Sequence, residues 1–338
     1  MRHFNKLFIT VITGLLLLNS CKPDKLDVDV SEVKMPPVKF MRFEKEFFSI
    51  TPQNIREKTA KLSSEYGSFY HMFVNTVKGR SLPNDTNIIL AFVNNKDMRD
   101  AYQETQNVFN DKDIEKLENG MTDCIKRFAH FFPKRKLPKR FATCMSGFDY
   151  NYAYPDSVMA VSLEMYLGSN NMFYKMLQWP NYQVRVLNKE YMLTDMVRGW
   201  MITEFDNGEP VNDLIHNMLF YGRIIYACDA LLPDVPDTIK IGYTKAQMKY
   251  CQTYEKNLWG FFAENNRLYE NNMKTITEFT ADGPFTSAIS KECPPRIAMW
   301  TGWQIVRSYM KNNASVTVEE LMNEKDVLKI LNKSKYRP

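Results

Sequence analysis

Histidine is scarce in this 338-residue chain, which has only four. No two of them lie within five residues of each other, so the sequence has no H-E-x-x-H motif and no local set of zinc ligands. P-loop, dinucleotide-binding and G-x-S-x-G motifs are absent as well. The sequence therefore predicts no metal, no other cofactor and no catalytic residue that a motif would identify.

Long apolar runs are also missing after the first twenty residues, so no later segment has the roughly 20 apolar residues that cross a bilayer. Glycine is low, at 13 residues, and there is no internal repeat. Bases and acids nearly balance, at 44 and 39, which gives no sign of nucleic-acid binding. A hydrophobic content of 44% is enough for one large domain or two tightly packed lobes.

Cysteine spacing is uninformative about metals and disulfides. No pair has the C-x-x-C spacing of a zinc or redox motif, and five cysteines follow Cys21. Because five is odd, they cannot all pair within the chain, and free cysteines are often small buried hydrophobic residues. One disulfide is possible among these five residues, and the sequence favours no particular pair: Cys124, Cys144, Cys228, Cys251 and Cys293.

The first twenty residues have the pattern of a secretory signal. A basic start containing Lys6 precedes an apolar run from Leu7 to Leu18, which at about 12 residues is too short to span a membrane. Leu18-Asn19-Ser20-Cys21 fits a lipobox, in which the cysteine thiolate takes a diacylglyceryl group. We expect residues 1–20 to be a lipoprotein signal peptide, cleaved before Cys21. The alternative is an ordinary signal peptide followed by a cysteine without that role.

Removal of residues 1–20 takes away two bases and no acid, so the net charge falls from +5 to about +3. Residues 21–37 are polar, carry several aspartates and end in Pro36-Pro37. They are expected to form the acylated N-terminus and a flexible tether. Residues 38–338 are expected to form a single folded domain.

Hydrophobic periodicity predicts strands in the first half of the body and long helices in the second. The predicted strands are 38–43, 140–145 and 157–163, of which the last two could form a hairpin with a long loop. The predicted helices are 51–65, with Thr51 as N-cap, then 84–109, 111–131, with Asp111 as N-cap, 191–204, 211–231, 244–264, 295–311 and a short one from Thr317, whose Glu320 would complete a capping box. This order predicts an α+β domain.

Five charged residues are candidates for lining a cleft. Glu164 ends a predicted strand, where a carboxylate can face a cleft or simply be solvated or hydrogen-bonded. Asp195, Arg198 and Glu204 share one predicted helix, and the i, i+3 spacing of the first two suits an ordinary ion pair. Asp213 stands at the start of the next helix, where its charge favours the helix dipole. Structural roles are the default for all five.

The segment 295–311 is apolar over most of its predicted helical surface, which usually means a buried helix. Gly302 would permit a close backbone approach. Trp300 and Trp303 could share one face and, with Trp179, could alternatively stack on a peptide or glycan. That reading would make the chain a binding lipoprotein of the outer membrane.

Several segments, read together with the signal and Cys21, form a recognisable pattern that covers nearly the whole chain. They are Phe40–Phe48, Val158–Gly168, Asp195–Trp200 with Glu204, Tyr221–Tyr226 and Pro295–Met310. This pattern resembles the gliding motility lipoprotein GldB family of Bacteroidota. The resemblance implies anchoring in the outer membrane by the N-terminal lipid and an envelope-protein partner from the gliding or secretion machinery. The sequence Lys22-Pro23-Asp24-Lys25 is a poor surface-export signal, which favours the periplasmic face.

The order of these segments also resembles predicted zinc proteases of the zincin type. In those proteins a helix carries H-E-x-x-H, whereas the matching helix here reads Thr194-Asp-Met-Val-Arg-Gly-Trp200, without either histidine. The resemblance therefore implies a zincin-like α+β fold, mostly helical with a small sheet, in a pseudoenzyme whose old substrate cleft binds a partner. The remaining alternative is a hydrolase that uses Glu164, Asp195, Glu204 and Asp213 as acid–base groups.

Overall fold

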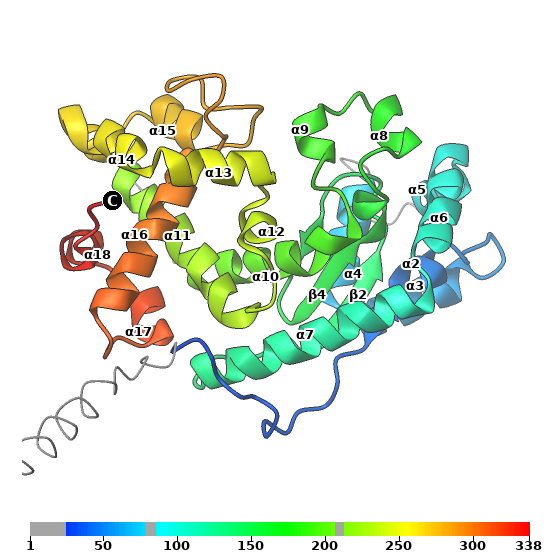
Figure 1. The fold of residues 1–338 in the computed structure, drawn as a ribbon. Coiled ribbons are helices and arrows are strands. Elements are labelled where there is room, and N and C mark those ends of the chain that lie inside the picture. The colour runs from blue at the N-terminus through cyan, green and yellow to red at the C-terminus, as the bar shows by residue number, and fades with distance from the viewer. Residues whose placement is uncertain (1–24, 79–85, 207–212) are drawn as a thin grey trace, which may run out of the picture.

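A small mixed sheet in the N-terminal half is embedded in a mostly helical chain, as Figure 1 shows. The computed structural model describes residues 25–78, 86–206 and 213–338. The described part confirms the predicted α+β class. The signal peptide and Cys21 lie outside it, as do the predicted first residues of helices 84–109 and 211–231.

The sheet has four strands in the order β1-β2-β4-β3. These are β1 (Phe40–Arg42), β2 (Arg140–Cys144), β3 (Tyr152–Ala153) and β4 (Val158–Ser162). The central strands β2 and β4 are parallel, with Ala142 opposite Ala160, so the hairpin considered from the sequence is wrong. The two-residue β3 runs antiparallel to β4 and returns the chain, which lets β4 start again in the direction of β2.

Helices cover both faces of this sheet, because every residue of β4 is buried although successive side chains point to opposite faces. The first group of helices comprises α2 (Phe43–Phe47), α3 (Ile55–Tyr66), α4 (Ser68–Lys78), α5 (Thr86–Asn94), α6 (Lys96–Val108) and α7 (Asp111–Phe131). Of these, α2 packs on β2 and α4 on β4.

Three predicted helix boundaries in this group are wrong. The helix expected from Thr51 begins at Ile55, after a turn in which Asn54 Oδ1 accepts from the Thr51 amide. The single helix expected over 84–109 is broken at Asn95, whose side chain caps α6. The capping residue of α7 is Asn110 rather than Asp111. At Asn95 and Asn110 the asparagine side chain accepts from free amides of the helix that follows, whereas Asn54 makes no capping bond to α3.

The second group follows the sheet. It comprises α8 (Met172–Met176), α9 (Asn181–Val184), α10 (Lys189–Phe205), α11 (Leu214–Leu231), α12 (Asp237–Ile241), α13 (Lys245–Thr253), α14 (Glu255–Ala263), α15 (Met273–Thr280), α16 (Ile297–Asn312), α17 (Val318–Asn323) and α18 (Val327–Ser334). Two 3₁₀ turns, η2 (Leu163–Tyr166) and η3 (Glu264–Tyr269), interrupt the series. The helix predicted over 244–264 is two helices that meet at Tyr254, and the predicted Thr317–Glu320 capping box is confirmed.

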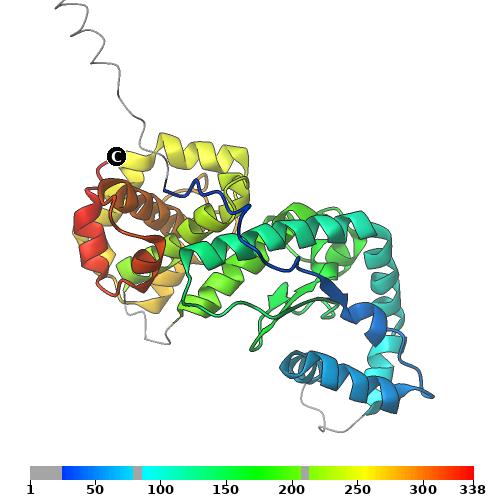
Figure 2. The ribbon, with the colours of Figure 1, turned by 90° about the horizontal axis from the view of Figure 1, so that it is seen from below.

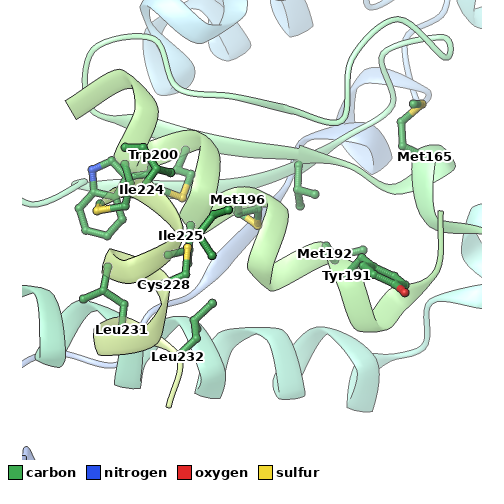
Figure 3. Close-up of a cluster of buried hydrophobic side chains, with 14 of the residues drawn as sticks. Met165, Tyr191, Met192, Met196, Trp200, Ile224, Ile225, Cys228, Leu231 and Leu232 are labelled. Carbon is green, nitrogen blue, oxygen red and sulfur yellow. The ribbon is translucent and has the colours of Figure 1, made fainter. Parts of the chain in front are cut away.

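Helices α11 and α16 cross at close range. A Cβ on Gly302 would lie 1.9 Å from the carbonyl oxygen of Met218, and one on Gly222 would lie 2.4 Å from the Gly302 carbonyl carbon. Both positions therefore require glycine, and the close approach predicted for Gly302 is confirmed. The core continues from here through the buried side chains of α10 and α11 in Figure 3, among them Trp200 and Ile225. The five cysteines after Cys21 are all buried and free.

Residues 25–37, expected as a tether, contain no helix or strand but lie against the body (Figure 2). Lys25 Nζ donates to the carbonyl of Val316, Val30 is buried, and at the far end the Val38 amide donates to Thr122 of α7. We call residues 25–37 the strap. The described part of the predicted tether is therefore docked on the body rather than free. Within the described ranges, no helix is long and apolar enough to cross a membrane.

Candidate functional site

Polar side chains gather where the parallel strands β2 and β4 end. Ser146 follows β2, and Glu164 lies in η2 directly after β4. Glu164 is fully buried, and its Oε1 accepts hydrogen bonds from Ser146 Oγ at 2.7 Å and from the Phe148 amide at 3.1 Å. The carboxyl ends of parallel strands are where open α/β sheets usually bind ligands. The strand-end carboxylate expected from the sequence is therefore present, but it is hydrogen-bonded and buried.

The second oxygen of Glu164 is left without a partner. Its Oε2 is buried with no hydrogen bond, and so is the nearby hydroxyl of Tyr150. Burial raises the pKa of Glu164 to about 7, against the partial opposing effect of the Ser146 hydrogen bond. A buried carboxyl group that titrates near neutral pH is a recognised mark of a functional site, although ordinary structural networks also produce it.

A strained turn aims the backbone at this carboxyl group. Gly147 and Phe148 both have positive φ angles, of 80° and 66°. The second value is costly for a bulky residue, by about 1–3 kcal/mol. The turn is held because Ser146 Oγ accepts from the Asp149 amide while it donates to Glu164.

Tyr166, also in η2, joins this group to helix α10. Its hydroxyl donates to Asp195 Oδ2 at 2.9 Å and accepts from Asn151 Nδ2 at 3.3 Å. The other oxygen of Asp195 accepts from Arg198 Nη2 at 2.6 Å, which confirms the predicted i, i+3 pair. Burial raises the pKa of Asp195, and the neighbouring Arg198 opposes the rise. Both carboxylate oxygens are therefore already engaged.

Beyond Arg198 lies a cavity of about 110 Å³ between α10, α11, α12 and the start of α16. Two guanidinium groups, those of Arg198 and Arg296, are on its wall together with Tyr221. Apolar side chains such as Ile225 and Met299 make up much of the remainder. We call this space the two-arginine cavity. It lies beside the α10 residues that the sequence singled out.

Arg296 was missed by sequence reasoning. It is the residue before α16, with a left-handed φ of 57°, and its side chain is 15% exposed. Its Nε lies 3.6 Å from Asp282 Oδ1 and makes no hydrogen bond. The one local signal was the preceding Pro294-Pro295, which indicates a helix start but not a side-chain direction.

Two of the predicted cleft residues lie elsewhere and have structural roles. Glu204 pairs with Arg135 at 2.8 Å near the end of α10. Asp213 caps α11, where its Oδ1 accepts from the His216 amide. The structure thus joins Asp195 and Arg198 to Tyr166, two residues after Glu164, whose carboxyl group has its own partners, and it places Glu204 and Asp213 elsewhere.

The tryptophans predicted as a stacking surface are mostly internal. Trp300 and Trp303 are 2% and 0% exposed, which removes the basis for their stacking on a ligand. Trp303 Nε1 donates to buried Asp229 at 2.8 Å. Trp179 is partly buried and stacks on Tyr174, with ring centroids 5.6 Å apart.

A larger pocket of about 1000 Å³ lies beside the strap and is lined in part by Lys25. Its floor is an ion network in which Asp229 binds Lys240 at 3.0 Å and Arg307 at 2.9 Å. Arg307 also pairs with Asp237 at 2.7 Å, so the network is internally neutralised.

In the described part of the chain, no three His, Cys, Asp or Glu side chains are grouped so that they could hold a metal ion. The family described as "Gliding motility protein GldB" matches residues 23–338. No curated protein matches the chain, and neither does any solved structure.

Proposed function

The chain belongs to the gliding motility protein GldB family, and from that membership we propose that it is a non-catalytic, lipid-anchored envelope protein that binds another envelope component. The anchor is a lipid on Cys21, in the outer membrane and facing the periplasm. The partner belongs to the gliding or secretion machinery, and it engages the body at the cleft beside α10.

The arrangement around α10 is the observation that carries the proposal. In a zincin-like fold, Thr194, Asp195 and Arg198 would occupy the positions of the H-E-x-x-H residues. Here Asp195 and Arg198 bond to each other, and Tyr166 takes the remaining oxygen of Asp195. A catalytic zinc site keeps an open position for water, whereas Asp195, Arg198 and Tyr166 are bonded to one another here, and the Thr194 hydroxyl is buried without a partner. That closed set supports a binding role for the former cleft.

A photocrosslinking experiment tests the binding role. A crosslinking amino acid at Met299, on the wall of the two-arginine cavity, should give one discrete adduct with an envelope protein in intact cells. The matched control position is Met176, which is 59% exposed on α8 and should not give that adduct. The proposal fails if neither position, or both equally, yield the adduct.

Three further measurements address the anchor, the side of the membrane and the chemistry. Cys21→Ser should move the protein from the membrane to the soluble fraction, and protease added to intact cells should leave the wild-type protein uncut. Cutting without lysis would place the protein on the cell surface instead. Metal analysis of the purified protein tests the proposal that it is non-catalytic. One zinc ion bound per chain would contradict that proposal.

A hydrolase is the second candidate, and the raised pKa of Glu164 favours it, since a carboxyl group titrating near 7 can transfer protons at neutral pH. Its support is narrower, because Glu164 is fully buried and Asp195 is engaged. Glu204 and Asp213 lie outside the group. Hydrolysis by the purified protein that disappears in Glu164→Gln would favour this candidate.

A further inference from the structure

The two-arginine cavity combines cations with apolar walls. Arg198 and Arg296 line it together with apolar residues that include Ile225, Ile241 and Met299. At about 110 Å³ the cavity admits only a small chemical group. Such a lining suits a ligand with an anionic head and a short aliphatic body.

The two arginines are unequally satisfied. Arg198 is held by Asp195 at 2.6 Å and donates from Nη1 to the carbonyl of Lys240 at 3.2 Å. Arg296 has its nearest carboxylate, Asp282, at 3.6 Å, and its Nη2 reaches the Gly242 carbonyl only at 3.5 Å. A buried cation without a hydrogen-bonded anion is costly, so an anion that enters the cavity gains a favourable partner.

The backbone holds Arg296 in this place. The left-handed φ of 57° is rare for a long side chain and is strained. The preceding residue is fixed because the buried hydroxyl of Tyr243 donates to the carbonyl of Pro295 at 2.6 Å. Burial lowers the pKa of Arg296, and the nearby charge of Arg198 adds to that effect. The guanidinium is therefore held beside another cation rather than released to solvent.

We infer that this cavity binds a carboxylate bearing a small aliphatic group. The carboxylate pairs with Arg296 and lies toward Arg198. The aliphatic group lies against Ile225, Ile241 and Met299. A planar guanidinium matches a planar carboxylate with two parallel hydrogen bonds. The apolar walls offer few donors for the additional oxygens of sulfate or phosphate.

This inference rests on the proposed function, because it assigns a ligand chemistry to the same cleft. The carboxylate has two sources: the last residue of a partner polypeptide, or a free short-chain acid. Both present the same head and body to the cavity.

Titration calorimetry of the full lipidated protein in detergent, at low salt, tests it. The probes are isovalerate, isovaleramide, sodium sulfate, and the tripeptide Ala-Ala-Leu with a free or an amidated carboxyl end. Isovalerate should bind at least tenfold more tightly than isovaleramide, and sulfate should bind more weakly than isovalerate. Tighter binding of the free tripeptide than of isovalerate identifies a polypeptide end, and the reverse order identifies a free acid.

Variants distinguish binding in the cavity from binding to the detergent micelle or to the rest of the protein surface. Arg296→Met should weaken isovalerate binding at least tenfold, whereas Arg99→Met, which removes an arginine from α6, should leave it unchanged. Met299→Trp fills the cavity without removing a charge and should also abolish binding. It keeps the test decisive if the Arg296 variant fails to fold.

Equal binding of acid and amide, sulfate binding as tight as isovalerate, or no binding by any probe would overturn the inference. The proposed function fails by a different result, the absence of a specific adduct at Met299 in cells. An adduct at Met299 without binding of any acid leaves partner binding in place and removes only the carboxylate.

Discussion

Glu164 should make the stability of the folded protein depend on pH. Its pKa is about 7 in the folded protein because it is buried, against an ordinary value of 4.5. Between these values the folded protein holds a proton that the unfolded chain releases. The free energy of unfolding therefore falls as the pH rises from about 4.5 to 7, and it levels off above that window.

The magnitude follows from the size of the pKa difference. At about 1.4 kcal/mol per pH unit, the penalty for the charged carboxylate reaches about 3 kcal/mol at pH 8. Glu164→Gln keeps the shape and stays neutral, so it lacks this penalty. From pH 5 to pH 8 the variant should gain about 2–3 kcal/mol relative to the wild type, most of it before pH 7.

Urea unfolding of the purified protein at pH 5, 6, 7 and 8 measures this difference, with the fluorescence of the buried tryptophans as the signal. Ser146→Ala supplies an internal check. Because Ser146 donates to Glu164 Oε1 and lowers its pKa, its removal should shift the midpoint of the pH dependence upward. A wild-type-to-Gln difference that stays constant within about 1 kcal/mol from pH 5 to 8 would refute the reasoning.

Three other predictions concern packing and the strap. Gly302→Ala should destabilise the protein by about 3 kcal/mol or more in urea unfolding, because the helices must separate, whereas Gly260→Ala, with its nearest atom at 3.9 Å, should be neutral or stabilising by up to about 1 kcal/mol. Equal effects would contradict the close crossing. Asp229→Ala should cost about 3–5 kcal/mol in the same assay, since it leaves buried Lys240 with only the more distant Asp237, at 3.9 Å, and a cost under 1 kcal/mol would argue against the network. Val30→Asp should speed proteolytic cleavage within residues 25–37 about tenfold or more, because a buried valine contributes about 1.5–3 kcal/mol to docking of the strap. Mass spectrometry of the fragments measures the rate, and an unchanged rate would show that Val30 does not hold the strap.

Continuous apolar runs made the sheet strands predictable, and alternating apolar positions made the long helices predictable. The pairing of the strands and the break between two helices were not predicted correctly. The parallel pairing of β2 and β4 depends on the two-residue β3, which is too short to show any period. The break at Asn95 was missed because the apolar pattern continues through it, while the capping bond that ends one helix and starts the next is local.

The site was predictable where it follows from spacing along one helix. The Asp195–Arg198 pair is such a case, and so is the place of Asp213 at a helix start, although its capping bond was not predicted. The burial of Glu164 and the placement of Arg296 depend on segments distant in sequence, so no local pattern reveals them. Tyr166 was overlooked because a tyrosine in an apolar run looks like a core residue until its hydroxyl partner is known.

Docking of the strap also sets how far the body can move from its point of attachment. With the proposed lipid on Cys21, four Cα–Cα steps separate the anchor from Lys25, which is bonded to the body, so the free length is at most about 14 Å. If residues 22–37 were released, the same chain could extend about 55 Å. The docked strap therefore reduces the radius over which the protein can meet a partner about fourfold. It favours partners that stay close to the same membrane leaflet.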